Sequence, residues 1–469
     1  MSKVQYPFYI IILAIFIGII SPFLLTHSMF MDGILYADIA HNLARGLGSF
    51  WDVKLTETLY PHFHEHPPLA FGLQSLWFRL FGDSIYIEKL YSLTTFFITA
   101  ILIHEIWQMI QAESKKYYSW IALFFWILIP LVTWAAPNNM LENTMMIFTT
   151  WAVLHIFLSS KNRRLFHLSM GGILLFLGVL SKGLVALFPL ALPFWLFIYE
   201  RNALSFKRFI ADSLVLLVGI SISFLILFVL MPESKISLYA YFTKQIMGSI
   251  QSVQTVESRF FILVRLLKEL LPMIIVSLIV VLIPKKEKIS YQNTKWSVVL
   301  FLLGLSGVVP IMISMKQSGF YILATFPLFS LSLASFILPN VEVWVQKVNA
   351  RSSGFRIFKY LSIGLVVVSI GLSLSQVGRM GRDKEKLEDV LVLTRILPKG
   401  TTISISNKME QDWSLHGYMY RYGDISLEVN SPSPFLLTLK GANVSLIEYN
   451  ELSVQLHTFS IYKKKTIPQ

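Results

Sequence analysis

The chain has 469 residues, of which 55% are hydrophobic and only 14% are charged, and its formal net charge is +13 at pH 7. Soluble domains carry roughly one quarter charged residues, so this composition excludes an ordinary soluble protein and indicates a chain that lies mostly in lipid. Cysteine is absent, which excludes disulfides, thiolate metal sites and cysteine nucleophiles.

Apolar runs of membrane-spanning length recur along most of the chain, and we predict about eleven transmembrane helices. The first run begins soon after Lys3 and is interpreted as a retained signal anchor, because no small-residue cleavage site follows it. The N-terminus is then cytoplasmic. The predicted spans cover residues 7–25, 86–109, 118–136, 141–158, 166–181, 184–199, 209–231, 261–283, 297–314, 320–338 and 358–376.

Lysine and arginine concentrate in the short loops that this alternation places inside the cell, as the positive-inside rule requires. An odd number of spans then places the C-terminus outside. The basic residues of these loops are Lys115, Lys116, Lys161, Arg163, Arg164, Arg201, Lys207, Arg208, Lys285, Lys286, Lys288, Lys347, Arg351, Arg356 and Lys359.

Past the last predicted span the composition becomes polar, and short strand-like stretches alternate with helix-like ones. We therefore predict a transmembrane part at residues 1–377, with a first outside loop at 26–84, and a small C-terminal α/β domain outside the membrane at 378–469. Within that domain, strands are predicted at 401–406, 426–429, 435–440 and 454–461, and helices at 385–397 and 412–422.

The first outside loop begins with an acidic residue at the membrane boundary. Asp32 follows the first span directly, and Tyr36 continues at helical spacing, so a short interfacial helix would hold this carboxylate at membrane depth. A carboxylate there is costly unless it has a task or a partner. Asp32 is therefore either a functional acid or a cap for exposed N–H groups at the start of that helix.

The same loop contains the run His64-Glu65-His66 immediately before Pro67-Pro68. A diproline fixes the backbone and favours an extended conformation ahead of it, so these side chains are held in place. Together with His62, the histidines alternate and could bind a metal on one face of an extended segment, although an ordinary polar loop is the favoured interpretation. The sequence requires no cofactor and leaves a divalent cation open.

Three further charged residues fall on the same outer face. Glu142 opens the fourth span, where the helix dipole alone would favour a carboxylate. Lys182 and Lys316 are isolated between spans, where a lysine commonly extends its amine toward the interface. Collected on one face, however, acids and lysines favour a site for an anionic lipid headgroup.

The order and topology of five motifs, over roughly residues 8–340, resemble those of the GT-C glycosyltransferases of family 39. That group contains protein O-mannosyltransferases and the bacterial aminoarabinose transferases that modify lipid A. The resemblance implies the GT-C fold and inverting transfer of a sugar from a polyprenyl-phosphate donor on the outer face. The motifs are Asp32-Gly33 with Tyr36, Glu65-His66-Pro67-Pro68-Leu69, Leu141-Glu142, Leu180-Ser181-Lys182-Gly183, and Lys316 through Tyr321 with Pro327.

The resemblance also implies roles for individual residues. Asp32 takes the position of the general base that acts on the acceptor hydroxyl, and Glu65 and Glu142 match the further acids. Many members have a second acid where this chain has Gly33, which bears on the acceptor or on metal dependence. His66 stands where several relatives carry lysine, so contact with phosphate there depends on histidine protonation. The implied substrate-binding residues are Tyr36, His64, His66, Lys182, Lys316 and Tyr321.

We therefore predict a membrane glycosyltransferase that moves a hexose or pentose from a polyprenyl phosphate to a lipid, glycan or protein acceptor, as in protein glycosylation or lipid A modification. Its predicted partners are the polyprenyl-phosphate-linked sugar donor, the acceptor molecule and the membrane lipids. Nucleic acid is not a predicted partner. The lack of a large insertion between spans favours a bacterial inner-membrane protein with a periplasmic active site.

Two other function classes remain open. A transporter or flippase of a lipid-linked anion could use the same charged cavity, but such proteins often show broken helices in repeated halves, and no repeat is visible here. An interaction scaffold with an outside binding domain would leave the clustered charges unexplained.

Overall fold

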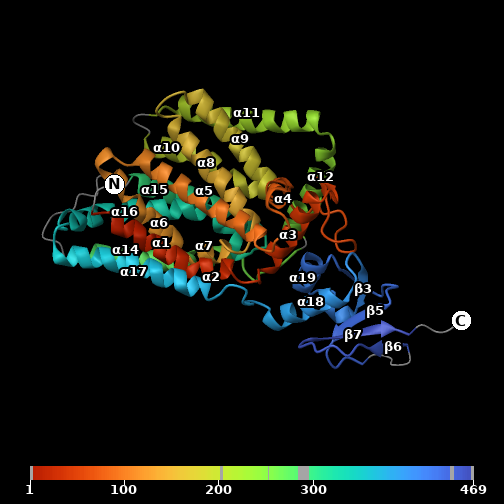
Figure 1. Cartoon of the computed structure of the whole chain (residues 1–469). Coiled ribbons are helices and arrows are strands. Elements are labelled where there is room, and N and C mark those ends of the chain that lie inside the picture. The colour runs from red at the N-terminus through yellow and green to blue at the C-terminus, as the bar shows by residue number, and fades with distance from the viewer. Residues whose placement is uncertain (1–3, 201–203, 252, 284–294, 444–447, 466–469) are drawn as a thin grey trace.

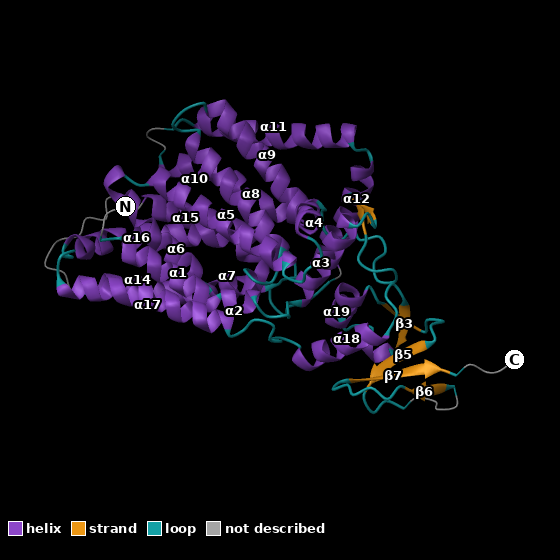
Figure 2. Cartoon of the chain, viewed as in Figure 1, coloured by secondary structure: helices purple, strands orange, loops and turns teal. Residues whose placement is uncertain are grey.

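The computed structural model describes residues 4–200, 204–251, 253–283, 295–443 and 448–465. Figure 1 shows a bundle of helices and a smaller C-terminal domain, with the N-terminus at the end of the bundle remote from that domain. Figure 2 shows that the main sheet lies in the C-terminal domain, whereas the bundle is helical. Of the predicted basic loop residues, Arg201, Lys285, Lys286 and Lys288 fall outside the described residues.

Each predicted span coincides with one or two helical segments. Seven of the described helical stretches are long and apolar enough to cross a membrane, while α1 and the η2–α10 stretch are shorter, and α14 carries Arg265, Lys268 and Glu269. The segments are α1 (Tyr6–Ile19), α2 (Ser21–Leu24), α5 (Ile87–Ile110), α6 (Ser119–Leu128), α7 (Pro130–Ala135), α8 (Leu141–Leu158), α9 (Arg164–Lys182), η2 (Leu184–Ala191), α10 (Leu192–Tyr199), α11 (Phe206–Leu230), α14 (Phe261–Leu282), α15 (Lys295–Val308), η4 (Val309–Ile313), η5 (Gly319–Thr325), α16 (Phe326–Gln346) and α17 (Ser353–Leu374).

The third predicted span is broken by proline. Ile129 is extended and Pro130 starts α7, so the chain cannot continue as one helix. The buried carboxylate of Glu269, on α14, accepts a hydrogen bond of 2.8 Å from the backbone N–H of Leu131. Arg265 lies 2.6 Å from the other oxygen of Glu269. A charged side chain thus stabilises a helix break inside the bundle, as membrane proteins require of freed backbone groups.

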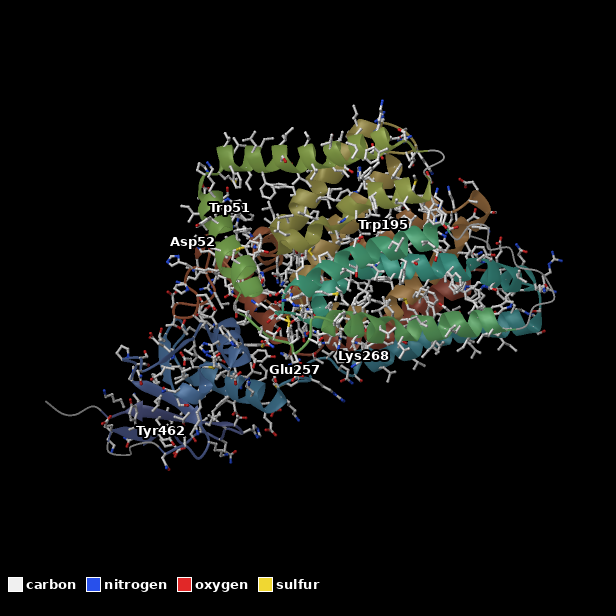
Figure 3. All side chains as sticks on the ribbon, turned by 180° about the vertical axis from the view of Figure 1, so that it is seen from behind. Trp51, Asp52, Trp195, Glu257, Lys268 and Tyr462 are labelled. Atoms are coloured by element: carbon white, nitrogen blue, oxygen red, sulfur yellow. The ribbon has the colours of Figure 1, made fainter. Side chains whose placement is uncertain are left out.

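The segments predicted to lie outside the membrane contain structure of their own. The first outside loop holds α3 (Met31–Ala44), a short antiparallel pair β1 (Gly48–Ser49) and β2 (Asp52–Val53), and α4 (Leu69–Phe81), which starts after the diproline. A second outside stretch holds α12 (Glu233–Tyr241), η3 (Phe242–Met247), which is a π-helix, and α13 (Gly248–Gln251). In Figure 3, Asp52 and Glu257 lie near the junction with the C-terminal domain, whereas Trp195 lies along the helices and Tyr462 in the sheet.

The C-terminal domain is a five-stranded sheet with strand order β4-β3-β5-β7-β6. Strand β3 pairs in parallel with β4 and β5, and β7 pairs antiparallel with β5 and β6. The elements are α18 (Lys384–Ile396), β3 (Thr402–Ile405), η6 (Asn407–Met409), α19 (Trp413–Gly423), β4 (Ser426–Val429), β5 (Phe435–Leu439), β6 (Tyr449–Glu451) and β7 (Phe459–Lys464).

One predicted strand of this domain has the wrong bounds. The sequence predicts a strand at 454–461, but β7 begins only at Phe459. The carboxylate of Asp389 accepts hydrogen bonds from the backbone N–H groups of His457, at 2.6 Å, and Thr458, at 2.7 Å. These N–H groups are therefore bonded to a side chain of α18, and residues 454–458 do not pair as a strand.

The C-terminal domain packs on α3 through α19. The Tyr418 hydroxyl donates to the carbonyl of Met29 at 2.9 Å, and the Tyr420 hydroxyl donates to Asn42 Oδ1 at 3.2 Å. Ile34 of α3 is part of the hydrophobic core of the domain. The helix that carries Asp32 is therefore fixed from both sides. The division of the chain at residue 377 stays a prediction.

Candidate active site

A cavity of about 530 Å³ lies between the end of α9 and the segments η2, η3, η4 and η5. The polar part of its wall contains five of the predicted site residues: His66, Glu142, Lys182, Lys316 and Tyr321. A wall that combines a few convergent polar groups with apolar surface suits an amphiphilic ligand. The apolar part includes Leu184, Val185, Leu187, Phe188, Ile246, Pro310, Ile311 and Ile313.

Lys182 is the centre of the polar part. Its side chain is 7% exposed, and Nζ lies 3.2 Å from Oε1 of Glu142, which is 1% exposed. Nζ also lies 3.5 Å from Nε2 of His66, and the Tyr36 hydroxyl lies 3.2 Å from the same nitrogen. Neither oxygen of Glu142 has a hydrogen-bond partner of good geometry among the described residues. A buried carboxylate left in this state retains capacity for a further ligand.

The backbone turn after Lys182 requires glycine. Gly183 has φ +112°, and a Cβ atom there would lie 1.8 Å from the hydroxyl oxygen of Tyr241. That hydroxyl donates to the carbonyl oxygen of Lys182 at 3.3 Å. Only glycine therefore lets Tyr241 of α12 close on the C-terminal end of α9.

Lys316 also lines the cavity. Its Nζ donates to Oε1 of Gln245 at 2.8 Å, and Gln245 lies in the π-helix η3. Short π-helical segments frequently accompany functional sites. Sequence reasoning missed Tyr241 and Gln245, which also line the cavity; their spacing of four residues on a polar outside segment is the signal that could have found them.

Asp32 lies in the first turn of α3 and is half-buried. Burial raises the pKa of its carboxyl to about 6, against the lowering effect of Lys182, while Glu142 and Glu65 raise the pKa further. Asp32 makes no capping hydrogen bond: the residue before the helix is Phe30, whose N–H donates to Oδ1 of Asn138 at 2.8 Å. The capping interpretation thus lacks its hydrogen bond. Asp32 does not itself line the cavity.

His66 is held in its neutral form. Burial lowers the pKa of its imidazole well below the usual value, and the charges of Lys182 and Lys316 lower it further. The lysines, rather than a protonated His66, therefore provide positive charge in the cavity. A bound anion beside the ring would raise the pKa again.

The alternating histidines do not gather around one point. His62 Nδ1 lies 2.9 Å from Oδ2 of Asp52, and His64 Nε2 lies 3.4 Å from Oδ1 of the same residue. His64 Nδ1 lies 3.3 Å from the hydroxyl of Ser237, and His64 does not line the cavity. His66 contacts Tyr36 and Lys182 instead. Within the described ranges no three His, Asp or Glu side chains are placed to hold a metal ion.

Known proteins resemble this chain in part of its sequence and in its fold. Residues 65–229 match the family model described as dolichyl-phosphate-mannose-protein mannosyltransferase. The structure resembles ArnT from Cupriavidus metallidurans bound to undecaprenyl phosphate, with a TM-score of 0.64, 13% identity, and 97% of each chain covered. It resembles apo ArnT from the same organism with a TM-score of 0.64, 12% identity, and 98% of each chain covered. Among curated proteins, none matches this sequence.

The solved structures confirm the predicted polytopic helical fold with a small C-terminal sheet domain. Several apolar helices of spanning length belong to the same fold. The chain is therefore an integral membrane protein whose fold resembles that of ArnT, and part of it is similar to the family described as dolichyl-phosphate-mannose-protein mannosyltransferase.

Proposed function

We propose that the protein is a membrane glycosyltransferase that moves a sugar from a polyprenyl-phosphate carrier to an acceptor on the outer face. The observation that carries the proposal is the cavity, which joins two lysines to a long apolar wall. A lipid phosphate has the same two parts, a charged head and an apolar chain. The likeness to ArnT, which was solved with undecaprenyl phosphate, supports this ligand class.

Lys182 and Lys316 hold the phosphate of the donor in this proposal. Both amines line the cavity, and one is paired with a buried carboxylate that fixes its position. Charge-assisted contacts to phosphate are short and strong, and a water-poor site strengthens them. Tyr321 and neutral His66 complete the polar wall, with Tyr36 orienting His66.

Asp32 acts as the general base. The acceptor hydroxyl gives its proton to the Asp32 carboxylate, and its oxygen bonds to the anomeric carbon of the sugar. The bond between that carbon and the phosphate oxygen breaks, and the polyprenyl phosphate leaves with the electron pair, stabilised by the lysines. Attack from the face opposite the leaving group inverts the anomeric carbon. Glu65 and Glu142 supply negative charge near the oxocarbenium-like sugar.

The setting of the reaction follows from the charge pattern of the loops. The basic loops support a cytoplasmic end of the bundle opposite the C-terminal domain, so the proposed site faces the periplasm of a bacterial inner membrane. The donor sugar is a hexose or pentose, and the acceptor is a lipid, a glycan or a protein. Lipid A modification and protein glycosylation both lie within this class.

Two measurements test the proposal. Purified protein in lipid nanodiscs should bind undecaprenyl phosphate, and cells with and without the gene should differ in the mass of a surface glycolipid or glycoprotein by one sugar. A protein that moves a lipid-linked sugar across vesicles while leaving every surface glycan unchanged would instead be a transporter and would overturn the proposal.

A further inference from the structure

An aromatic pair bridges the first outside loop and the C-terminal domain. The rings of Tyr60 and Trp413 are stacked, with centroids 6.0 Å apart and planes 22° from parallel. Both side chains are half-buried, so part of each ring remains accessible. Tyr60 lies just before the His64 to His66 run, and Trp413 opens α19. The pair is therefore built from two segments more than 300 residues apart.

Contacts connect this pair to the proposed reaction centre. Burial, and then the charge of the nearby Glu65 carboxylate, raises the pKa of the Tyr60 hydroxyl. The Tyr60 ring packs edge-on against Phe63, 5.8 Å away, and Phe63 lies 6.2 Å from His66, which lines the cavity. Glu65 is also among the charges that raise the pKa of Asp32. The rings thus stand beside the cavity on the side of Glu65.

The turn that presents Tyr60 is strained and firmly held. Tyr60 has φ +48°, a conformation that is rare for an aromatic residue. The hydroxyl of Thr58 donates to the carbonyl of Leu427 at 2.8 Å, and the N–H of Glu57 donates to the hydroxyl of Ser426 at 3.1 Å. Strain of this kind persists where the surroundings determine the conformation, and it clusters at ligand sites.

We propose that Tyr60, Trp413 and Glu65 form the acceptor subsite, and that the group they take is a sugar ring. This inference rests on the proposed function and names its acceptor class. The C–H face of a pyranose packs on an accessible aromatic face, and its hydroxyls bind a carboxylate. In the part of the chain that the structure describes, the indole N–H of Trp413 has no partner and is free to donate to a further hydroxyl.

The carbohydrate class follows from the combination of groups. Flat rings with a carboxylate at their edge match an acceptor that is apolar on its face and rich in hydroxyls at its rim. The subsite accepts such a ring whether it belongs to a free glycan or to a glycolipid. The reacting hydroxyl then loses its proton to Asp32 as in the proposed transfer, with the phosphate as leaving group.

The test is binding by purified full-length protein in nanodiscs to arrays of three probes: bacterial core oligosaccharides, intact lipopolysaccharide, and Ser/Thr-containing peptides. We expect oligosaccharide or lipopolysaccharide spots to bind. Trp413→Ala should weaken that binding roughly ten-fold, and Trp413→Phe, which keeps a ring, should retain most of it. If the protein binds free oligosaccharide as well as lipopolysaccharide, the sugar ring alone is sufficient for recognition. If the protein binds lipopolysaccharide but not free oligosaccharide, the acceptor is a glycolipid.

A matched control is Tyr449→Ala, an equally half-buried aromatic on β6 in the same domain, which should bind the carbohydrate normally. Undecaprenyl phosphate binding, measured in parallel, should be unchanged in all variants. Binding of peptides in place of carbohydrate, or normal carbohydrate binding by Trp413→Ala, would overturn the subsite. Loss of undecaprenyl phosphate binding in the unaltered protein would instead refute the proposed function. If Trp413→Ala does not fold, Tyr60→Phe decides, since it keeps the ring but removes the hydroxyl near Glu65 and should weaken carbohydrate binding several-fold.

Discussion

Buried charges differ in their hydrogen bonding between the cavity and the interface where α19 meets the first outside loop and α5. In the cavity, Lys182 and Glu142 face each other, yet both Glu142 oxygens lack a hydrogen bond within the described chain. In the interface, the Arg421 guanidinium, which is 2% exposed, donates to Glu88, to Asp83 and to two carbonyl oxygens. The Arg421 network uses its donors within the protein, whereas the unused oxygens of Glu142 line a cavity where a ligand can reach them.

Two acids of the interface have pKa values that are shifted in opposite directions. Although burial raises the pKa of Asp83, hydrogen bonds and charge from His41 and Arg421 lower it to about 2. Asp38 is fully buried on α3 with neither oxygen hydrogen-bonded to another described residue, and burial raises its pKa well above the usual value. Asp38 is therefore held neutral. Asp32 and Asp38 lie six residues apart on one helix, and only Asp32 is assigned a part in the proposed reaction.

The largest expected effect separates these two acids. Asp32→Asn should lower sugar transfer by about 10²- to 10⁴-fold, the usual contribution of a general base, while binding of undecaprenyl phosphate survives. Asp38→Asn is the matched control and should transfer normally, because an amide replaces a carboxyl that is already neutral. Transfer assays on both purified variants check this. Near-normal transfer by Asp32→Asn would remove Asp32 from the role of base.

The next effect concerns the saturated network. Arg421→Met should destabilise the docked C-terminal domain by about 3 to 5 kcal/mol, because it leaves Glu88 buried without its partner. Thermal unfolding of the purified protein measures the loss. Arg45→Met provides the comparison, since Arg45 and Asp424 form a more exposed pair whose removal should cost about 0 to 1 kcal/mol. Equal losses in the two variants would show that the Arg421 network does not hold the domain.

A smaller effect is expected at the cavity. Lys182→Met and Lys316→Met should each weaken binding of undecaprenyl phosphate by about 1 to 3 kcal/mol, because each removes a charge-assisted contact. Lys235→Met, an exposed lysine on α12, is the control for net charge and should bind normally. Titration of each variant with the lipid phosphate gives the affinities. Unchanged binding by both cavity variants would place the phosphate elsewhere.

Much of this architecture could be predicted from the sequence because its causes are local. Apolar runs give the spans, and the Lys182-Gly183 turn places a lysine at an outer end. The sequence predicts that Lys182, Glu142 and His66 lie on the same face of the membrane, and only the resemblance to a known family predicts that they share one site. The roles of these residues stay predictions.

The features that sequence analysis missed depend on distant contacts. Arg421 and Trp413 gain their partners only when the C-terminal domain docks on the first outside loop. Similarly, residues 454–458 have a strand-like pattern, but the backbone N–H groups of His457 and Thr458 bond to Asp389 on α18. Tertiary contacts of this kind override local propensity.

The last prediction is the pH dependence of transfer. Its effect is the smallest at neutral pH, and it distinguishes Asp32 from Asp38 most sharply. A general base works only when ionised, and burial raises the pKa of Asp32 to about 6. The rate should therefore be near its plateau at pH 7.5 and fall about ten-fold per unit below pH 6.

Neutral His66 should not contribute to this fall, because its pKa is shifted below the usual value, so it stays uncharged as the carboxylate begins to protonate. Measuring kcat/KM from pH 5 to 8 gives the profile for the unaltered protein and for Asp38→Asn, and the two should coincide. Asp32→Asn should keep its low residual rate without the acid limb. If that limb persists in Asp32→Asn at the same midpoint, another group titrates in the site, and the raised pKa of Asp32 has no part in the reaction.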